Sequence, residues 1–347
     1  MKLRDIANVA GVSLTTVSLV LNGKAGVSQE KREQIIDLLL ENNYHIRVPQ
    51  DSDSSYNNIR FLKYSKHSYL VNGNPGFVTQ IMDAVEKECR KHNYNLLITA
   101  FDDFGSINLD ELLANPTTKG VILLGTEIAN EDMAAFSNIG KPMVVVDNGL
   151  PQLPFSTVTM NNRDAIFTAV HHLLELGHRH IGFLYNSLPS NNDAERRQAF
   201  EDALRFYGRP FEMDLVFSVF PTMDGARQST AGLLRKNTRF PTALVANNDS
   251  IAIGAIRALQ DSGLNIPQDI SVTGFDGLPF STMAEPPLTT VNVPCSDIGY
   301  WAVRILHECI KGRSTSLCKM LVGTSFAVRG STAAYHLPRV HPNLLGE

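Results

Sequence analysis

The stretch Val9-Ala10-Gly11-Val12-Ser13-Leu14-Thr15-Thr16-Val17-Ser18 decides how this 347-residue chain begins to fold. Gly11 can adopt the positive φ that a tight corner between two helices needs. Ser13 is a good helix cap, because its side-chain oxygen can accept a backbone N–H that the first turn leaves without a partner. Apolar residues continue at helical spacing on both sides of this corner, at Leu3, Ile6, Ala7 and Ala10 before it and at Val17, Val20 and Leu21 after it. The sequence therefore predicts a helix-turn-helix.

A helix-turn-helix indicates a DNA-binding role. In such units the second helix lies in the major groove, with its first residues over the base edges. We expect three side chains of this helix to contact bases and three hydroxyl groups to contact phosphates. The base-contacting candidates are Leu14, Thr15 and Leu19, and the phosphate-contacting candidates are Ser13, Thr16 and Ser18. The alternative is a pair of helices that only pack against each other.

The same region resembles the start of LacI/GalR-family repressors. The resemblance is carried by Arg4-Asp5-Ile6-Ala7 and by Val17-Ser18-Leu19-Val20-Leu21-Asn22-Gly23. It implies a sequence-specific DNA-binding transcriptional regulator of the repressor type, and it adds Asn22 to the DNA-contacting candidates. Leu19 stands where family members usually carry Arg. Because Leu can contact a thymine methyl group but cannot donate to a guanine edge, we expect a different base preference at that position.

The charge of the chain limits how it can bind DNA. With 31 Lys and Arg against 35 Asp and Glu, the net charge is −4, so the chain as a whole offers no basic field. Residues 1–48, which we expect to form a three-helix head, carry six basic and five acidic side chains, a net charge of +1. One such head should bind weakly. We therefore expect a homodimer that places two heads on a palindromic double-stranded operator.

A polar segment at 49–58 is expected to be a linker, because it has few apolar side chains to bury. The LacI/GalR family usually carries a short hinge helix here, with a Leu that enters the minor groove. This chain has no matching Leu, and Asp51 and Asp53 would be repelled by phosphate. We expect a flexible tether, an atypical hinge, and an operator that is bent less than those of family members.

From residue 59 onward, short apolar strands alternate with amphipathic helices. This alternation is typical of parallel sheets with helices on both faces. The expected strands lie at 59–62, 95–100, 120–124, 143–147, 181–185, 242–247 and 271–275. The expected helices lie at 77–92, 130–137, 162–176, 193–207, 224–235 and 249–262.

The core is expected over 59–335, as two doubly wound α/β subdomains that split near 155–161. Late strands at 288–293 and 322–328, flanking a helix at 296–311, indicate that the chain crosses back between the halves. The resemblance implies the same fold class, a small all-α helix-turn-helix head with a periplasmic-binding-protein-like core. The tail at 336–347 lacks a leucine heptad, which favours a dimer over a coiled-coil tetramer.

Polar residues follow three of the expected strands. In open parallel sheets, ligands bind outside the carboxyl ends of the strands. Asp147, Asn248 and Asp276 stand at such ends. Asp249 is expected to be a helix cap, and Asp147 and Asp276 could also be turn formers. Arg196, near the start of the next helix, could present two donors to adjacent oxygens or be a solvated helix residue.

Two aromatic residues in loops, Phe77 and Phe220, could stack on a sugar ring. Together with carboxylates, amides and a guanidinium, they favour a polyhydroxylated ligand over an apolar one. In the LacI/GalR family the positions resembling Asp147, Arg196, Asn248 and Asp276 commonly touch the effector, and an aromatic like Phe220 often stacks on it. The resemblance thus implies allosteric control of operator binding by a small sugar, a sugar phosphate or another sugar derivative.

The segment 63–74 is longer than the corresponding family loop. We interpret it as a solvated surface insertion. The alternative is that its cations reach the cleft mouth and favour a phosphorylated or acidic sugar. Those cations would be Lys63, Lys66 and His67.

The α/β pattern also allows two other classes of protein: an α/β enzyme acting on a sugar, and a sugar-binding protein without regulatory output. The chain has no nucleotide-binding glycine loop, nucleophile elbow or zinc-protease motif, so we expect no enzyme activity and no cofactor.

Four histidines near a helix-to-strand corner, at 171, 172, 178 and 180, fit a structural turn better than a metal site. The four cysteines suggest neither a zinc site nor a disulfide framework. No segment reads as a signal peptide or membrane span, and we expect a cytoplasmic protein.

Overall fold

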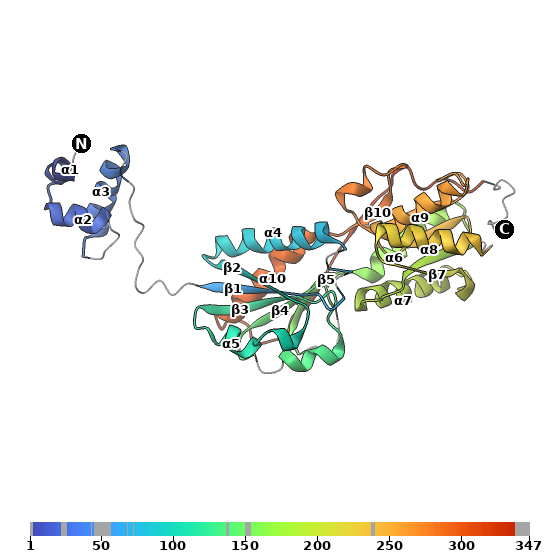
Figure 1. Ribbon diagram of the computed structural model, residues 1–347, viewed down its shortest axis with the longest axis horizontal. Helices are drawn as coiled ribbons and strands as arrows, with labels where there is room; N and C mark the ends of the chain where they lie inside the picture. Colours follow the sequence, from blue (N-terminus) through green and yellow to red (C-terminus); the bar gives the residue numbers. More distant parts are fainter. Residues whose placement is uncertain are drawn as a thin grey trace. The chain divides into compact units, whose positions relative to one another are not determined.

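The computed structural model describes residues 3–21, 26–42, 44, 57–67, 69–71, 73–136, 139–149, 154–236 and 240–336. The chain divides into two compact units, Met1–Asn57 and Asn58–Glu347, and each is described by itself (Figure 1). Three predictions lie outside the described residues: the role of Asn22, the linker apart from its last two residues, and the tail beyond His336. None of the helices in the described part of the chain is long and apolar enough to span a bilayer.

The first unit contains three helices around a small apolar core. They are α1 (Leu3–Ala10), α2 (Leu14–Leu21) and α3 (Gln29–Glu41). Gly11 has a φ of 66°, and the Ser13 hydroxyl accepts a hydrogen bond from the Thr16 backbone N–H at 3.1 Å. Both features of the predicted corner are thus confirmed. The buried core side chains are Ile6, Ala7, Ala10, Val17, Val20, Ile35 and Leu39.

The second unit contains two six-stranded sheets. The first has the order β11-β5-β4-β3-β1-β2 and the second the order β12-β10-β9-β8-β6-β7. The strands of the first sheet are β1 (Asn58–Tyr64), β2 (Asn95–Phe101), β3 (Thr118–Leu124), β4 (Met143–Val146), β5 (Ser156–Met160) and β11 (Lys319–Val322). Those of the second are β6 (Ile181–Asn186), β7 (Val216–Val219), β8 (Ala243–Ala246), β9 (Ser271–Asp276), β10 (Thr289–Asn292) and β12 (Ser325–Ala327). All neighbours are parallel except β12, which runs antiparallel to β10.

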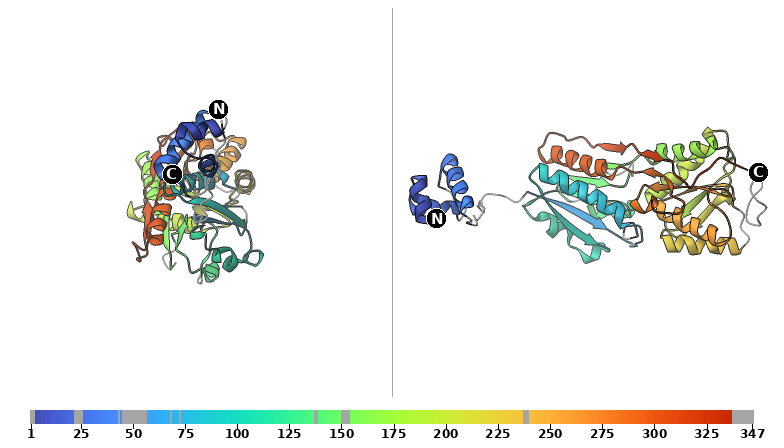
Figure 2. Two further views of the ribbon diagram at one scale, coloured as in Figure 1. Left: turned by 90° about the vertical axis from the view of Figure 1, so that its left-hand side faces the viewer. Right: turned by 90° about the horizontal axis from the view of Figure 1, so that it is seen from above.

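Helices cover both faces of these sheets, because successive strand residues point to opposite faces. In β6, Phe183 packs in one cluster with residues of α6 and α7, whereas Leu184 packs in another cluster with residues of α8 and α9. In the first sheet, α10 packs beside α4 (Figure 2). The helices are α4 (Pro75–Lys91), α5 (Leu109–Ala114), α6 (Asn162–Glu175), α7 (Asn191–Phe206), α8 (Met223–Arg235), α9 (Asp249–Asp261) and α10 (Cys295–Ile310).

The chain passes between the two halves three times. It leaves the first sheet after β5, returns through α10 to β11, and crosses again to β12. The expected strand at 322–328 is therefore two short strands in different sheets. The expected helix at 130–137 is a 3-10 helix, η2 (Asn130–Phe136), and α5 was not anticipated. Three further 3-10 turns are η1 (Phe104–Ser106), η3 (Met213–Leu215) and η4 (Pro279–Ser281).

Candidate functional site

The second helix of the head exposes its first residues. Ser13, Leu14 and Thr15 are exposed, and the Leu14 side chain is 45% accessible. Thr16, Ser18 and Leu19 are half-buried, while Val17 and Val20 point into the core of the head. This division follows from helical spacing and leaves the N-terminal end of α2 open to a partner. The Thr16 and Ser13 hydroxyl groups hydrogen-bond to each other at 2.8 Å.

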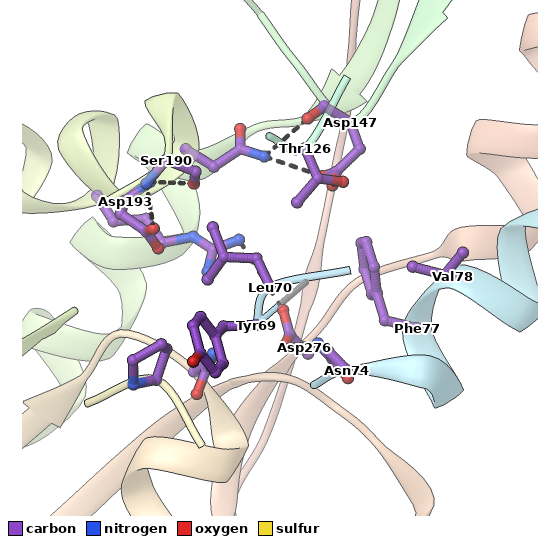
Figure 3. A pocket seen from close by; sticks show the side chains of 14 residues that line it. Tyr69, Leu70, Asn74, Phe77, Val78, Thr126, Asp147, Ser190, Asp193 and Asp276 are labelled. Carbon is purple, nitrogen blue, oxygen red and sulfur yellow. Dashed lines mark hydrogen bonds and ion pairs between the residues drawn. The ribbon is translucent and has the colours of Figure 1, made fainter. Parts of the chain in front are cut away.

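A polar pocket lies in the second unit, between side chains of its two halves (Figure 3). Its cavity is about 50 Å³, room for only a few water molecules. The lining residues come from the carboxyl ends of strands, from the start of α7 and from the loop before α4. They are Tyr69, Leu70, Asn74, Phe77, Val78, Thr126, Asp147, Ser190, Asn192, Asp193, Arg196, Pro221, Asn248 and Asp276.

Two buried carboxylates stand at the strand ends. Asp147 follows β4 with a φ of 60°, and Asp276 ends β9 with a φ of 111°. Non-glycine residues rarely adopt such angles, and they occur often at functional sites. Burial raises the pKa of Asp147 to about 6, although hydrogen bonds from Thr126 and Asn192 favour its ionised form. Burial likewise raises the pKa of Asp276 well above its usual range, against the opposing effect of Arg196.

Arg196 is the one cationic side chain among the described residues that line this pocket. It projects from α7, is 5% exposed, and lies over the Phe275 ring with its guanidinium 3.6 Å from the ring centroid. Its Nε donates to Asn162 Oδ1 at 2.9 Å and its Nη1 donates to the Asn247 carbonyl at 2.8 Å. Nη2 lies 3.9 Å from Asp276 Oδ1. The arginine is therefore held in one orientation beside a carboxylate.

Several pocket residues were missed in the sequence. Asn192 Nδ2 donates to Asp147 Oδ1 at 2.9 Å, and Asn74 Nδ2 donates to Asp276 Oδ2 at 2.9 Å, so both bonds join the two halves. Asp193 forms a capping box with Ser190 at the start of α7. The Ser-x-x-Asp spacing was a readable signal for that cap, but no local signal marks a pairing between Asn74 and a residue 202 positions away.

The aromatic predictions have different outcomes. Phe77 lines the pocket and is buried, but it lies in the first turn of α4 and not in a loop as expected. Phe220 is not among the lining residues, because the Tyr69 ring packs edge-on against it with centroids 5.0 Å apart. Tyr69 therefore supplies the aromatic surface that we assigned to Phe220. Asn248 lines the pocket and also caps α9, since its Oδ1 accepts from the Ile251 N–H at 2.8 Å.

That cap corrects the expected role of Asp249, which is the first residue of α9. Asp249 is a buried structural acid, since it accepts from the Leu278 N–H at 2.8 Å and from the Thr290 hydroxyl at 2.5 Å. Burial raises its pKa to about 7.

The segment 63–74 is solvated only in part: Lys66, His67, Tyr69 and Gly73 are exposed, whereas Tyr64, Ser65 and Val71 are buried. Its first two residues belong to β1, and Tyr69 and Leu70 line the pocket. The Glu127 carboxylate holds the following loop by accepting three backbone N–H groups, from His67 at 2.7 Å, Leu70 at 3.2 Å and Val71 at 3.0 Å. The Val71 N–H is fully buried and requires such a partner, and the same carboxylate also accepts the two partly buried donors.

Two cations of this segment, Lys66 and His67, line a second cavity that shares Leu70, Thr126 and Ser190 with the pocket. Lys66 Nζ lies 3.7 Å from Glu131 and 3.5 Å from Asp132. Its charge is thus already balanced by two carboxylates, which weakens the phosphorylated-sugar hypothesis.

The histidines near 180 make structural contacts. His178 is buried and forms hydrogen bonds with Thr242, Ser271 and the Ala333 carbonyl, and His180 contacts Glu212 at 2.6 Å. Among the residues that the structure describes, no group of three or more ligating side chains could hold a metal ion. The four cysteines are free thiols.

Comparison with known proteins adds independent findings. Residues 2–46 match the family described as "Bacterial regulatory proteins, lacI family", and residues 170–332 match the "Periplasmic binding protein-like domain". The ribose operon repressor of Haemophilus influenzae is 30% identical over 332 residues, covering 95% of this chain and 98% of the relative. The transcriptional regulator MalR of Streptomyces coelicolor is 31% identical over 346 residues, covering 96% and 97%.

Solved structures agree over most of the chain. The lac repressor dimer bound to operator and the anti-inducer ONPF has a TM-score of 0.73 at 25% identity, covering 96% of this chain and 99% of that one. The CelR–cellobiose complex has a TM-score of 0.71 at 25% identity, covering 95% and 99%. With the helix-turn-helix and the two-halved α/β core, these matches show that the chain belongs to the LacI family and is a DNA-binding transcriptional repressor, not an enzyme.

Proposed function

We propose that the chain acts as a homodimer that binds a palindromic operator through α2 and releases it when a neutral sugar binds in the core pocket, whose two halves have to move apart to admit the sugar because the free volume is only about 50 Å³. The observation that carries this proposal is the pocket itself: three carboxylates and an oriented arginine gather between the two halves. Hydroxyl groups of a sugar can donate to the carboxylates and accept from the guanidinium.

The charge of the pocket favours a neutral sugar over a sugar phosphate. Asp147, Asp193 and Asp276 outnumber Arg196, and Arg196 is already bonded to Asn162 and Asn247. An added phosphate would find no free counter-charge in this poorly solvated site, even though the raised pKa values of Asp147 and Asp276 lessen the repulsion. A solved LacI-family regulator from Enterococcus faecium with bound ribose, 25% identical with a TM-score of 0.68, supports a sugar as the ligand class.

Coupling between sugar and operator follows from the placement of the pocket. The bonds Asn192–Asp147 and Asn74–Asp276 already cross from one half to the other, so a ligand between them should favour one arrangement of the halves. If the operator favours the other arrangement, the sugar weakens operator binding and the operator weakens sugar binding by the same free energy, about 1–3 kcal/mol.

DNA binding is tested by Thr15→Ala. We expect a loss of discrimination between operator and unrelated DNA in a mobility-shift assay, with sugar binding unchanged, because Thr15 is exposed on α2, outside the second unit. Operator affinity of the wild type should fall steeply with salt, since phosphate contacts release counterions. Equal loss of sugar and DNA binding in a folded variant would contradict the assignment.

Sugar control is tested by Asp276→Asn. We expect a protein that still binds its operator but no longer releases it when the sugar is added. A thermal-shift screen of sugars and sugar phosphates on the wild-type protein identifies the ligand to use. A variant that still responds at the wild-type sugar concentration would contradict the proposed role of Asp276.

A further inference from the structure

The second helix of the head lacks the side chains that read bases through paired hydrogen bonds. In the major groove Arg and Lys pair with guanine, Asn and Gln pair with adenine, and Asp and Glu accept from cytosine. None of these six residue types occurs in α2, Leu14–Leu21. The described basic residues of the head belong to α1 and α3, and Asn22, which follows α2, lies outside the described residues.

The face of α2 that is open to a partner is largely apolar. Val17 and Val20 are buried in the core of the head. With 3.6 residues per turn, the side chains on the opposite side of the helix are Leu14, Thr15, Ser18 and Leu19. Leu14 begins the helix and is 45% exposed, Thr15 is exposed, and Leu19 is half-buried. The leucines and the Thr15 methyl group thus form an apolar strip where base contacts are expected.

The hydroxyl groups of α2 do not supply selectivity for one base. A hydroxyl can donate or accept, so those of Thr15 and Ser18 can bond to any base edge. The Thr16 hydroxyl is bonded to Ser13 Oγ at 2.8 Å, and Ser13 Oγ also accepts the Thr16 N–H at 3.1 Å. These two groups form the cap of the helix. The apolar strip is therefore the source of base selectivity within α2.

The thymine methyl is the apolar group that a base pair presents in the major groove. We infer that α2 selects its operator through thymine methyl groups, with T·A pairs opposite Leu14, Thr15 and Leu19 in each half-site. This inference rests on the proposed operator binding through α2 and names the feature of the operator that is recognised. It makes Leu14 and Leu19 specificity-determining residues.

The test starts from an operator that the full chain selects from a pool of random-sequence duplexes. Each thymine of the selected site is replaced in turn by deoxyuridine, which removes the methyl group and keeps every hydrogen-bonding group. Fluorescence anisotropy measures the affinity. We expect a loss of about fourfold for each methyl group that α2 contacts, because a methyl-sized apolar group returns to water. Where a C·G pair replaces such a T·A pair, 5-methylcytosine should restore part of the lost affinity.

Protein variants assign each methyl contact to a side chain. Leu14→Ala and Leu19→Ala should each abolish the deoxyuridine penalty at one thymine of the half-site and keep the others. Val9→Ala, at an apolar residue of α1 that is 58% exposed, is the matched control and should keep every penalty. If Leu19→Ala does not fold, Leu14→Ala still tests the inference from an exposed position.

Three outcomes overturn the inference. One is a selected site in which deoxyuridine is tolerated at every thymine, and another is a site that requires guanine in place of thymine opposite α2. Both would leave the proposed function standing. The third is a set of penalties that persist in folded Leu14→Ala and Leu19→Ala, which would place the methyl contacts outside α2. If the chain selects no DNA sequence, both the inference and the proposed operator binding fail.

Discussion

The two halves of the core have the same strand arrangement and different loops. Counted from the edge strands β2 and β7, the two sheets have matching strands at the first five places. At the sixth place they differ, because β11 is parallel to β5 whereas β12 is antiparallel to β10. Asp147 and Asp276 stand at the end of the fourth strand in each sheet, and both are buried at positive φ. Equivalent strands thus place two equivalent acids on opposite sides of one pocket.

The loops that follow β1 and β6 differ in length. In the first half residues 65–74 join β1 to α4, whereas in the second half residues 187–190 join β6 to α7. The long loop is held by Glu127, and the short loop is closed by the capping box of Ser190 and Asp193. The comparison shows that strand ends set the chemistry of the site, while loop length sets the space that remains for a ligand.

The halves also differ in charge. The first half contributes Asp147 to the pocket wall, while the second contributes two acids and the one cation among the described lining residues, Arg196. We expect Arg196→Ala to lower the free energy of unfolding by about 3–5 kcal/mol at pH 8, because buried acids lose their nearest cation. The loss should be smaller at pH 5, where the acids can take up protons.

Urea unfolding at both pH values measures this effect. Arg197→Ala is the control. Arg197 is next to Arg196 in the sequence, but it is only partly buried, and its guanidinium lies 5.5 Å from the centroid of the Tyr185 ring. The control should cost less than about 1 kcal/mol. An equal loss at pH 5 and pH 8 for Arg196→Ala would show that packing on Phe275, and not charge, is the larger contribution.

Asp147 should make stability depend on pH. Its pKa is about 6 in the folded chain against an ordinary value of 3.8, so the folded chain holds the proton to higher pH than the unfolded chain does. Its contribution to stability therefore falls as pH rises from about 4 to about 6, by about 3 kcal/mol in total. Asp147→Asn should remove this share of the pH dependence and leave the shares of Asp249 and Asp276, as measured by unfolding between pH 4 and pH 7.5.

The exposed acid Asp214 provides the matched control, and Asp214→Asn should keep the wild-type pH dependence. If Asp147→Asn keeps it as well, the buried charge at this strand end is not its source. The same comparison with Asp276→Asn would show whether the two equivalent acids titrate alike.

Removing the anchor of the long loop should affect that loop alone. Glu127→Ala leaves three backbone N–H groups without their acceptor, which should cost about 1–3 kcal/mol. We expect hydrogen exchange to accelerate at residues 67–71 and to stay unchanged at 187–190. Asp110→Ala, at an exposed side chain of α5, is the control and should change neither loop. Faster exchange in both loops would indicate that the halves loosen together.

The smallest expected effect concerns the contact between Tyr69 and Phe220. A double-mutant cycle with Tyr69→Leu and Phe220→Leu should give a coupling free energy of about 1 kcal/mol, typical of an edge-on ring pair. Unfolding measurements on the four proteins supply the cycle. A coupling near zero would show that the long loop is held against the second half by other contacts.

Much of the site was readable because its signals are local. Gly11 and Ser13 shape the corner of the head through their own backbone and side chain, and the strand-end rule places Asp147, Asn248 and Asp276 without knowledge of the rest of the fold. Arg196 was singled out differently, as a residue near the start of the helix that follows a strand and its loop, and the family resemblance supported it. These residues all line the pocket, except for the two in the head.

Other expectations differ from the structure where the answer depended on distant segments. Phe220 follows its strand as expected, but Tyr69, from the other half of the core, lies against it and takes the place at the pocket wall. The insertion at 63–74 has the polar composition of a surface loop, yet the Glu127 carboxylate accepts hydrogen bonds from its backbone and holds part of it beside the pocket.

By itself the sequence determined the helical corner, the alternation of strands and helices, and the acids at the strand ends, because each follows from spacing and backbone preference within a few residues. Only the tertiary structure decided which side chains share the pocket and how little space they leave between them. Those features depend on contacts such as Asn74 with Asp276, between residues 202 positions apart, whose proximity no local pattern records.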